Sequence, residues 1–155
     1  MLKSTAAMLL LLISSSPLLA EDMPAPVNAG AIKWGPAPSF LPTGAKIAVI
    51  AGDPSKQGMF VLRLDMPKNY AIAAHNHPTS EYVTVISGDF HIGMGDKLDK
   101  AKGIHLTRGG FGVAPAQMNH YAWTTSRTIV QVHGEGPFAI TYVNKADDPS
   151  NKPSQ

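Results

Sequence analysis

Residues 75–88 read HNHPTSEYVTVISG, and this stretch decides the fold that the sequence predicts. Side chains alternate across a β-strand, so His75 and His77 share one face. A proline-containing turn then returns the chain, and Glu81 begins a second strand beside the two imidazoles. The stretch therefore predicts a hairpin that brings three metal-ligating side chains together. Taken alone, a His-x-His pair is more often solvent-facing or hydrogen-bonded than metal-bound.

Short strand-like runs, separated by turn signals, recur along most of the chain. Strands are predicted at 46–52, 60–66, 71–77, 82–88, 90–95, 103–107, 111–116, 120–125, 128–134 and 138–144. A strand about every ten residues is typical of an antiparallel sandwich or barrel. Residues 96–103 (DKLDKAKG) are too short and polar for a core helix and are predicted to form a helical turn or a surface loop.

A second element, GGFGVAPAQMNHYAW at 109–123, changes the weight of the first. It supplies a glycine (Gly109), a proline (Pro115) and then a histidine (His120) at the head of another predicted strand.

Together the two stretches resemble the two motifs of the cupin superfamily. The first motif, G-x5-H-x-H-x3,4-E-x6-G, is matched at His75, His77, Glu81 and Gly88. The second, G-x5-P-x-G-x2-H-x3-N, is matched at Gly109, Pro115 and His120. The chain departs from the motifs at Asn69, Gln117 and Thr124, in place of Gly, Gly and Asn. Asparagine tolerates the positive φ of a glycine position better than glutamine does.

The resemblance covers roughly residues 58–135 and implies an all-β fold, the cupin double-stranded β-helix, which is a small jelly-roll-like barrel. It implies that His75, His77, Glu81 and His120 converge on one divalent transition metal, such as Mn, Fe, Ni or Zn. Nitrogen and oxygen donors of this kind suit these metals better than calcium or magnesium. Four protein ligands would leave two positions of an octahedral ion for a substrate or dioxygen.

The reaction is less defined than the site. Oxygenase-like chemistry on a small organic molecule is the first expectation, with decarboxylation or isomerisation behind it, and Glu81 is the candidate catalytic base. The alternative is a non-catalytic module that binds or senses a metal or small ligand. Residues 32–58 and 132–144 also resemble small secreted single-domain cupins of unassigned function. Whether the protein is an enzyme is therefore left open.

The first twenty residues are predicted to be a secretory signal peptide. They contain one cation (Lys3), an apolar run from Ala6 to Ile13 and an alanine before the acidic pair that begins at Glu21. The apolar run is too short to span a bilayer, which takes about 20 residues. We therefore expect a periplasmic or secreted protein without a membrane anchor after leader removal.

The remaining chain divides into three segments. Residues 21–44 are predicted to be an extended Pro-rich arm anchored by Trp34 and Phe40, 45–145 the cupin domain, and 146–155 a disordered tail. An arm of this kind can cross to a second subunit, so a homodimer is one interpretation of it. The chain has no cysteine, so disulfides cannot stabilise it.

The charge of the chain argues against nucleic acid as a partner. Without Lys3 the chain has 12 basic and 11 acidic residues, a balance that does not indicate binding to nucleic acid.

The orientation of three polar side chains stays open. On 128–134, Gln131 and His133 share one face, which lies either in the pocket or on the surface. Arg63 is either a solvated strand residue or a pocket cation for a carboxylate substrate.

Overall fold

The computed structural model describes residues 25–151, and β-strands account for most of its regular structure. The strands are β1 (Gly35–Pro36), β2 (Lys46–Ala51), β3 (Gly58–Met66), β4 (Ala71–Asn76), β5 (Glu81–Ser87), β6 (Asp89–Met94), β7 (Ile104–Thr107), β8 (Phe111–Ala114), β9 (His120–Trp123), β10 (Thr128–Gly136) and β11 (Thr141–Tyr142). Three 3-10 turns complete the set: η1 (Ala29–Ala31), η2 (Lys145–Asp147) and η3 (Pro149–Asn151). Within residues 25–151, no helix has the length and apolar character needed to cross a membrane.

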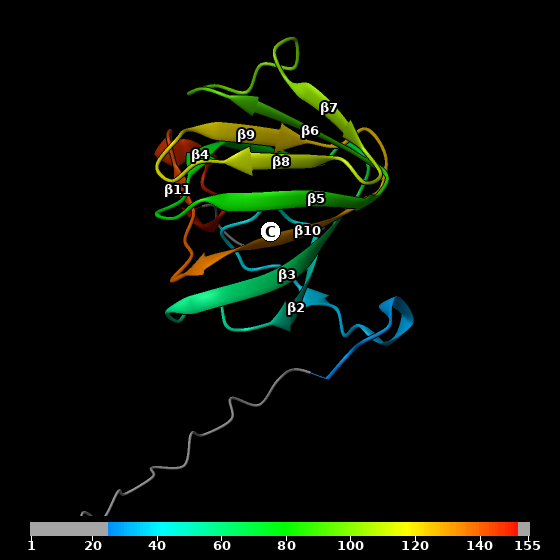
Figure 1. Ribbon diagram of the computed structural model, residues 1–155. Coiled ribbons are helices and arrows are strands. Elements are labelled where there is room, and N and C mark those ends of the chain that lie inside the picture. Colours follow the sequence, from blue (N-terminus) through cyan, green and yellow to red (C-terminus); the bar gives the residue numbers. More distant parts are fainter. Residues whose placement is uncertain (1–24, 152–155) are drawn as a thin grey trace, which may run out of the picture.

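The strands form two antiparallel sheets that face each other (Figure 1). The six-stranded sheet has the order β1-β2-β3-β10-β5-β8, and the five-stranded sheet has the order β11-β4-β9-β6-β7. From β3 to β11 the chain crosses between the sheets at every step except between β6 and β7, which are neighbours in the five-stranded sheet. The two-sheet arrangement confirms the predicted all-β class and the small double-stranded β-helix barrel. The hairpin predicted for residues 75–88 is wrong, because β4 and β5 lie in different sheets and the turn between them carries the chain from one sheet to the other.

The core lies between the two sheets and follows from the alternation of side chains along each strand. In the six-stranded sheet the inward positions are apolar, as with Leu62 and Leu64 of β3 and Val130 and Val132 of β10, all of which are buried. The five-stranded sheet contributes residues such as Ile92 to the same cluster. Both layers therefore present one apolar face to the barrel interior.

All ten predicted strands are present, but the last is shorter than expected. Of 138–144, only Thr141–Tyr142 pairs, with β4. Residues 138–140 use their backbone elsewhere: Phe138 N–H donates to the carbonyl of Pro54 at 2.7 Å, and the Ala139 carbonyl accepts from a histidine ring at 2.7 Å. Residues 96–103 form a loop with turns, as one of the two predictions had it.

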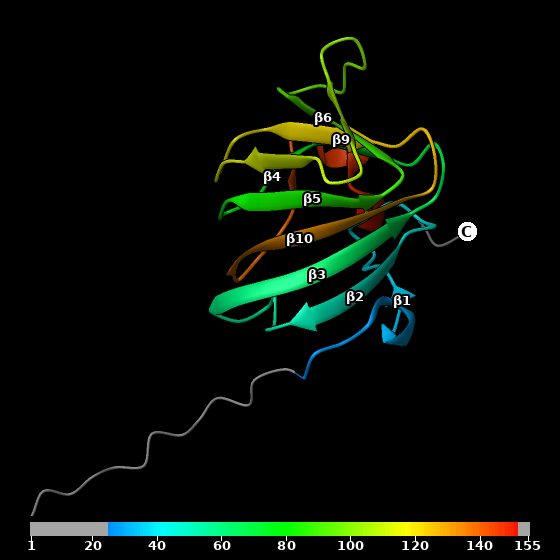
Figure 2. The ribbon, with the colours of Figure 1, turned by 45° about the vertical axis from the view of Figure 1, so that its right-hand side comes forward.

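Within the described residues, the N-terminal arm folds onto the barrel. Pro36 lies in β1, which pairs with β2 at the sheet edge, where a proline is tolerated (Figure 2). Two tyrosine hydroxyls hold the next stretch, with Tyr142 donating to the Phe40 carbonyl at 2.8 Å and Tyr70 to the Pro42 carbonyl at 2.6 Å. The anchoring side chain is Leu41, which is 8% exposed, whereas the predicted anchor Phe40 is 39% exposed.

Predictions were made for both ends of the chain, a signal peptide at 1–20 and a disordered tail at 146–155. The predicted signal peptide (1–20) lies outside the described residues. Residues 146–151, expected to belong to a disordered tail, form η2 and η3 instead. Short side-chain bonds support these turns, since Asn144 accepts from the Ala146 N–H at 3.1 Å and Asp148 from the Ser150 N–H at 2.9 Å.

At the two motif positions where this chain lacks glycine, the backbone still has the positive φ that glycine favours. Asn69 and Gln117 are the non-glycine residues with positive φ in the described chain, at 63° and 60°. Each is the third residue of a four-residue turn, closed by Tyr70 N–H to Pro67 at 3.4 Å and by Met118 N–H to Pro115 at 3.1 Å. A type II turn needs positive φ at this position, which explains the glycine preference.

Replacing Gln117 by glycine should stabilise the fold. Relief of the left-handed conformation, about 1–2 kcal/mol, exceeds the entropy cost of a glycine, about 0.5–1 kcal/mol. We expect Gln117→Gly to raise the free energy of unfolding by about 0.5–1 kcal/mol in denaturant titrations. The neighbouring Ala116→Gly should lower it, because Ala116 has no positive φ to relieve. A Gln117→Gly protein no more stable than wild type would contradict this reading.

Candidate metal centre

A β-bulge in β4 aims its histidines into the barrel. Ile72 pairs with Ala122 of β9, and His75 pairs with His120, so three steps along β4 match two along β9. This extra residue lets Ile72 and His75 both face the interior, which strict alternation would forbid. His77 follows two residues later on the same side, and all three histidines of the group are buried.

Each of the three imidazoles is held by its Nδ1 atom. His75 Nδ1 lies 2.7 Å from the Ala73 carbonyl, His77 Nδ1 lies 2.7 Å from the Ala139 carbonyl, and His120 Nδ1 lies 3.0 Å from the Met118 carbonyl. A carbonyl only accepts, so each Nδ1 carries a proton and each Nε2 is the nitrogen left to face the cavity. These bonds fix both the tautomer and the direction of the rings.

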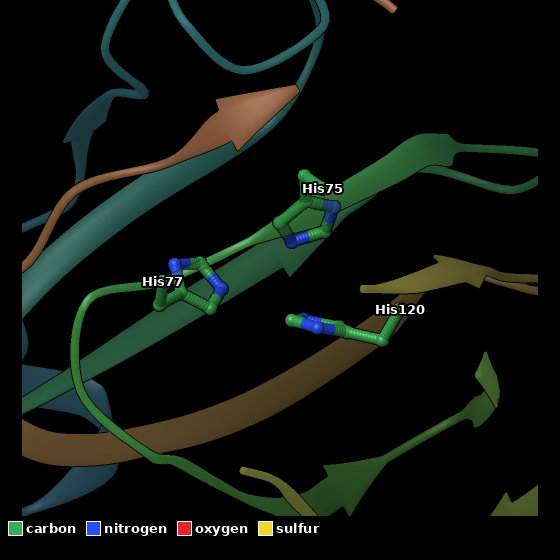
Figure 3. A group of neighbouring side chains, drawn as sticks. All are labelled: His75, His77 and His120. Carbon is green, nitrogen blue, oxygen red and sulfur yellow. The ribbon is translucent and has the colours of Figure 1, made fainter. Parts of the chain in front are cut away.

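The three Nε2-bearing rings converge on one point. Figure 3 shows His75, His77 and His120 pointing toward one another from β4, the segment after it, and β9. One nitrogen from each ring lies within 4.8 Å of the others. Within the described chain, the Nε2 atoms of His77 and His120 are buried and have no hydrogen-bond partner. Buried unpaired acceptors are costly, and a bound cation would satisfy them.

Glu81 joins this group from the start of β5. Its Oε2 lies 3.4 Å from His120 Nε2 and 3.6 Å from His77 Nε2. The structure therefore brings together all four predicted ligands, with the closest carboxylate contacts to His120 and His77. Three imidazole nitrogens and one carboxylate oxygen fit a divalent transition metal. The three histidines can hold a metal ion; that Glu81 also binds it stays a prediction.

Charge within the group is divided unequally. Burial, together with the imidazoles of His120 and His77, lowers the pKa of His75 to about 3, so this ring is neutral. Burial opposes the charge on Glu81, but His120 and His77 outweigh it and hold the pKa of this carboxyl below its usual range. Burial also lowers the pKa of His120, but Glu81 outweighs it and raises that pKa above the ordinary value. Without a metal, Glu81 and His120 thus favour a charged pair.

The four residues lie together on the wall of an interior cavity of about 280 Å³. Its walls come from both sheets and are otherwise apolar, as with Leu62, Val83, Ile92 and Val132. Apart from Ser55, the four site residues are the polar side chains on its walls within the described chain. A small molecule in this cavity would therefore contact mostly apolar side chains and one polar group, the three histidines and Glu81.

Arg63, Gln131 and His133 face away from the cavity, as the alternation of side chains along β3 and β10 shows. Phe60, Leu62 and Leu64 of β3 face the core, so Arg63 points outward, where its Nε donates to Gln131 Oε1 at 3.1 Å. His133 also lies outside, stacked on Tyr82 with the ring centroids 5.0 Å apart. None of the three side chains lines the cavity.

Sequence reasoning missed the segment that closes the site beside His77. Phe138 stacks on the His77 ring at 4.2 Å between centroids and 19° between planes, and the next residue, Ala139, supplies the carbonyl for its Nδ1. Neither residue belongs to a motif. The one sequence feature that could have indicated them is the apolar character of 138–140, which equally suits the strand predicted at 138–144.

A family model described as a domain of unknown function, DUF4437, matches residues 17–153. Among curated protein sequences, none matches the chain.

Solved structures with a similar fold share little sequence with this chain. The polyketide cyclase RemF from Streptomyces resistomycificus has a TM-score of 0.67 and 14% identity, covering 83% of this chain and 91% of its own. A proposed acetylacetone dioxygenase from Methylibium petroleiphilum PM1 has a TM-score of 0.63 and 20% identity, covering 85% and 89%. An RmlC-like cupin from Shewanella frigidimarina has a TM-score of 0.55 and 16% identity, covering 70% and 87%. At these identities the likeness shows the fold alone.

Metal binding at this group should stabilise the protein, and His120→Ala should reduce the effect. A site that binds only the folded state adds about 2.7 kcal/mol at free metal 100-fold above Kd. We expect zinc to raise the Tm of His120→Ala by less than it raises the Tm of the wild type, each compared with its own metal-free sample. His133→Ala, on the outer face, should keep the full increment. An equal increment in His120→Ala would place the bound metal elsewhere.

Proposed function

The chain belongs to a family described as a domain of unknown function, DUF4437, and from its cupin-like fold and the geometry of its site we propose that it carries out metal-dependent chemistry on a small, mostly apolar organic molecule. Oxygenation is the first expectation, with decarboxylation or isomerisation behind it. The observation that carries the proposal is the clustering of three inward histidines and Glu81 on the wall of an otherwise apolar cavity.

The donor set supports the metal part of the proposal. His75, His77 and His120 would hold the ion through Nε2, and Glu81 would offset its charge. The ion would be Mn, Fe, Ni or Zn, and when bound it would supply Lewis-acid or redox chemistry. The carbonyl bonds to the three Nδ1 atoms would keep the rings oriented, as is usual for metal-ligating histidines.

Glu81 is the candidate proton acceptor. Its carboxyl is anionic because its pKa is held below the usual range, and its side chain remains 15% exposed. It therefore combines a negative charge with access to the cavity. A carboxylate beside an apolar wall can take a proton from a bound molecule at a distance of one hydrogen bond.

The wall chemistry supports a particular substrate class. At about 280 Å³, the cavity is slightly smaller than the usual range for ligand pockets, which is about 300–1,000 Å³. Within the described chain, no lysine or arginine lines it, so a substrate carboxylate would find no partner except the metal. A compact molecule with an apolar body and two neighbouring oxygen atoms fits best, and a small β-diketone such as acetylacetone is a suitable first probe.

Turnover should be tested on protein loaded separately with each metal. A panel of β-diketones, catechols and small keto acids would be followed by oxygen consumption and by mass analysis of the products. We expect turnover with at least one metal, lost in His75→Ala and kept in Arg63→Ala, whose side chain lies outside the barrel. Ligands that bind without being converted by any loaded form would overturn the enzymatic proposal and favour the binding or sensing module.

Filling the cavity should block ligand binding without removing the metal. Val132 lines the cavity and its neighbour Gln131 faces outward. Val132→Phe should therefore weaken binding of a cavity ligand at least tenfold in calorimetry, whereas Gln131→Phe should leave it unchanged. Both variants should retain one equivalent of metal. Equal ligand affinity in the two variants would show that the ligand binds outside the cavity.

Export belongs to the proposal as well. The motif-bearing domain follows a predicted leader at 1–20, and removal of that leader would leave Glu21 as the first residue. Expression of the full chain in a Gram-negative host should yield a periplasmic protein whose N-terminal sequence begins with Glu21. A cytoplasmic protein that retains Met1 would contradict it.

A further inference from the structure

A second group of metal-ligating side chains lies on the other face of the five-stranded sheet. His91 of β6 pairs directly with His105 of β7, and Asp89 precedes His91 by two residues on the same face. One ligand atom from each residue lies within 4.8 Å of the others. Phe90 and Ile92, with the opposite parity, belong to the core. The group is thus separated from the interior site by the sheet itself.

We propose that Asp89, His91 and His105 form a second site for a divalent transition metal, outside the barrel. This site does not depend on the proposed function of the cavity. Two imidazoles and one carboxylate suit Cu²⁺ best among the common divalent ions, with Ni²⁺ and Zn²⁺ behind it.

His91 is the fixed ligand of this group. Its ring is stacked between Trp123, at 4.7 Å and 12°, and His105, at 4.4 Å and 10°. Its Nε2 atom is buried, has no hydrogen-bond partner among the described residues, and lies 3.7 Å from Asp89 Oδ1. Two ligand atoms on one ion, each bonded at about 2.1 Å, lie no more than about 4.2 Å apart. The spacing of this nitrogen and oxygen is therefore already that of a chelate.

Asp89 is held in place as an anion. Its Oδ1 accepts from the Thr125 N–H at 2.7 Å, and its Oδ2 accepts from the Ser126 hydroxyl at 2.7 Å. A carboxylate oxygen has two lone pairs, so Oδ1 can accept the Thr125 bond and still bind a cation.

His105 supplies the movable ligand. It is exposed, so its ring can rotate from the stacked position toward the ion without disturbing the core. The variant His105→Ala consequently tests the site without a large cost in stability, since exposed substitutions usually change it by less than about 0.5 kcal/mol. Asp89 is unsuitable for the test because its hydrogen bonds hold the loop at 125–126.

The experiment separates this site from the interior one by removing the latter. In a His75→Ala/His120→Ala protein, titration with Cu²⁺ at neutral pH should show one equivalent bound by calorimetry. The electron paramagnetic resonance spectrum should show nitrogen hyperfine coupling. Adding His105→Ala should weaken this binding at least tenfold. Adding His133→Ala, another histidine on an outer sheet face, should leave it unchanged.

Two outcomes would overturn the proposal: no Cu²⁺ bound by the double variant, or equal loss from His105→Ala and His133→Ala. If the double variant does not fold, the same comparison is made in the wild-type background. There His105→Ala should weaken one of the two Cu²⁺-binding events at least tenfold, and His133→Ala should not. Unchanged Cu²⁺ affinities in His105→Ala would again overturn it.

Discussion

The hydrogen bonds from three histidine Nδ1 atoms to backbone carbonyls are the interaction on which the interior site depends. They decide which nitrogen of each ring faces the cavity, and they do so with backbone that the fold already fixes. The carbonyls come from Ala73, Met118 and Ala139, on three separate segments. A ring held in this way has lost its rotational freedom before any ligand arrives, which is the usual basis of preorganised binding.

Two local backbone features make those bonds possible. The bulge in β4 brings Ile72 and His75 to the same side of the strand, so that one strand serves both the core and the site. The turn that leads into β9 contains Gln117, whose N–H donates to the His77 carbonyl at 2.8 Å. The left-handed conformation of Gln117 destabilises the fold locally. The hydrogen bond from Gln117 to His77 links the two sequence motifs. Strain of this kind is commonly retained where it positions functional groups.

The fold class and the proximity of His75, His77 and Glu81 could be predicted from the sequence, because the strand rhythm and the spacing of these three residues are local features. The predicted hairpin was nevertheless wrong, since β4 and β5 lie in different sheets and the turn between them brings the three side chains together across the barrel. What failed needed long-range information. The bulge depends on pairing between β4 and β9, the loss of pairing at 138–140 depends on Pro54 and His77, and the anchoring role of Leu41 rather than Phe40 depends on how the arm meets the barrel. The inward or outward direction of Gln131 and His133 likewise required the partner strands of β10.

In the proposed metal centre, the Nε2 atoms of three histidines hold one metal ion on the wall of the cavity. Crystals of the protein loaded with a single equivalent of zinc, measured on both sides of the metal absorption edge, test it most directly. We expect one anomalous peak within the cavity, about 2.0–2.1 Å from Nε2 of His75, His77 and His120. A crystal without that peak, or with the ion bound through Nδ1 atoms, would contradict it.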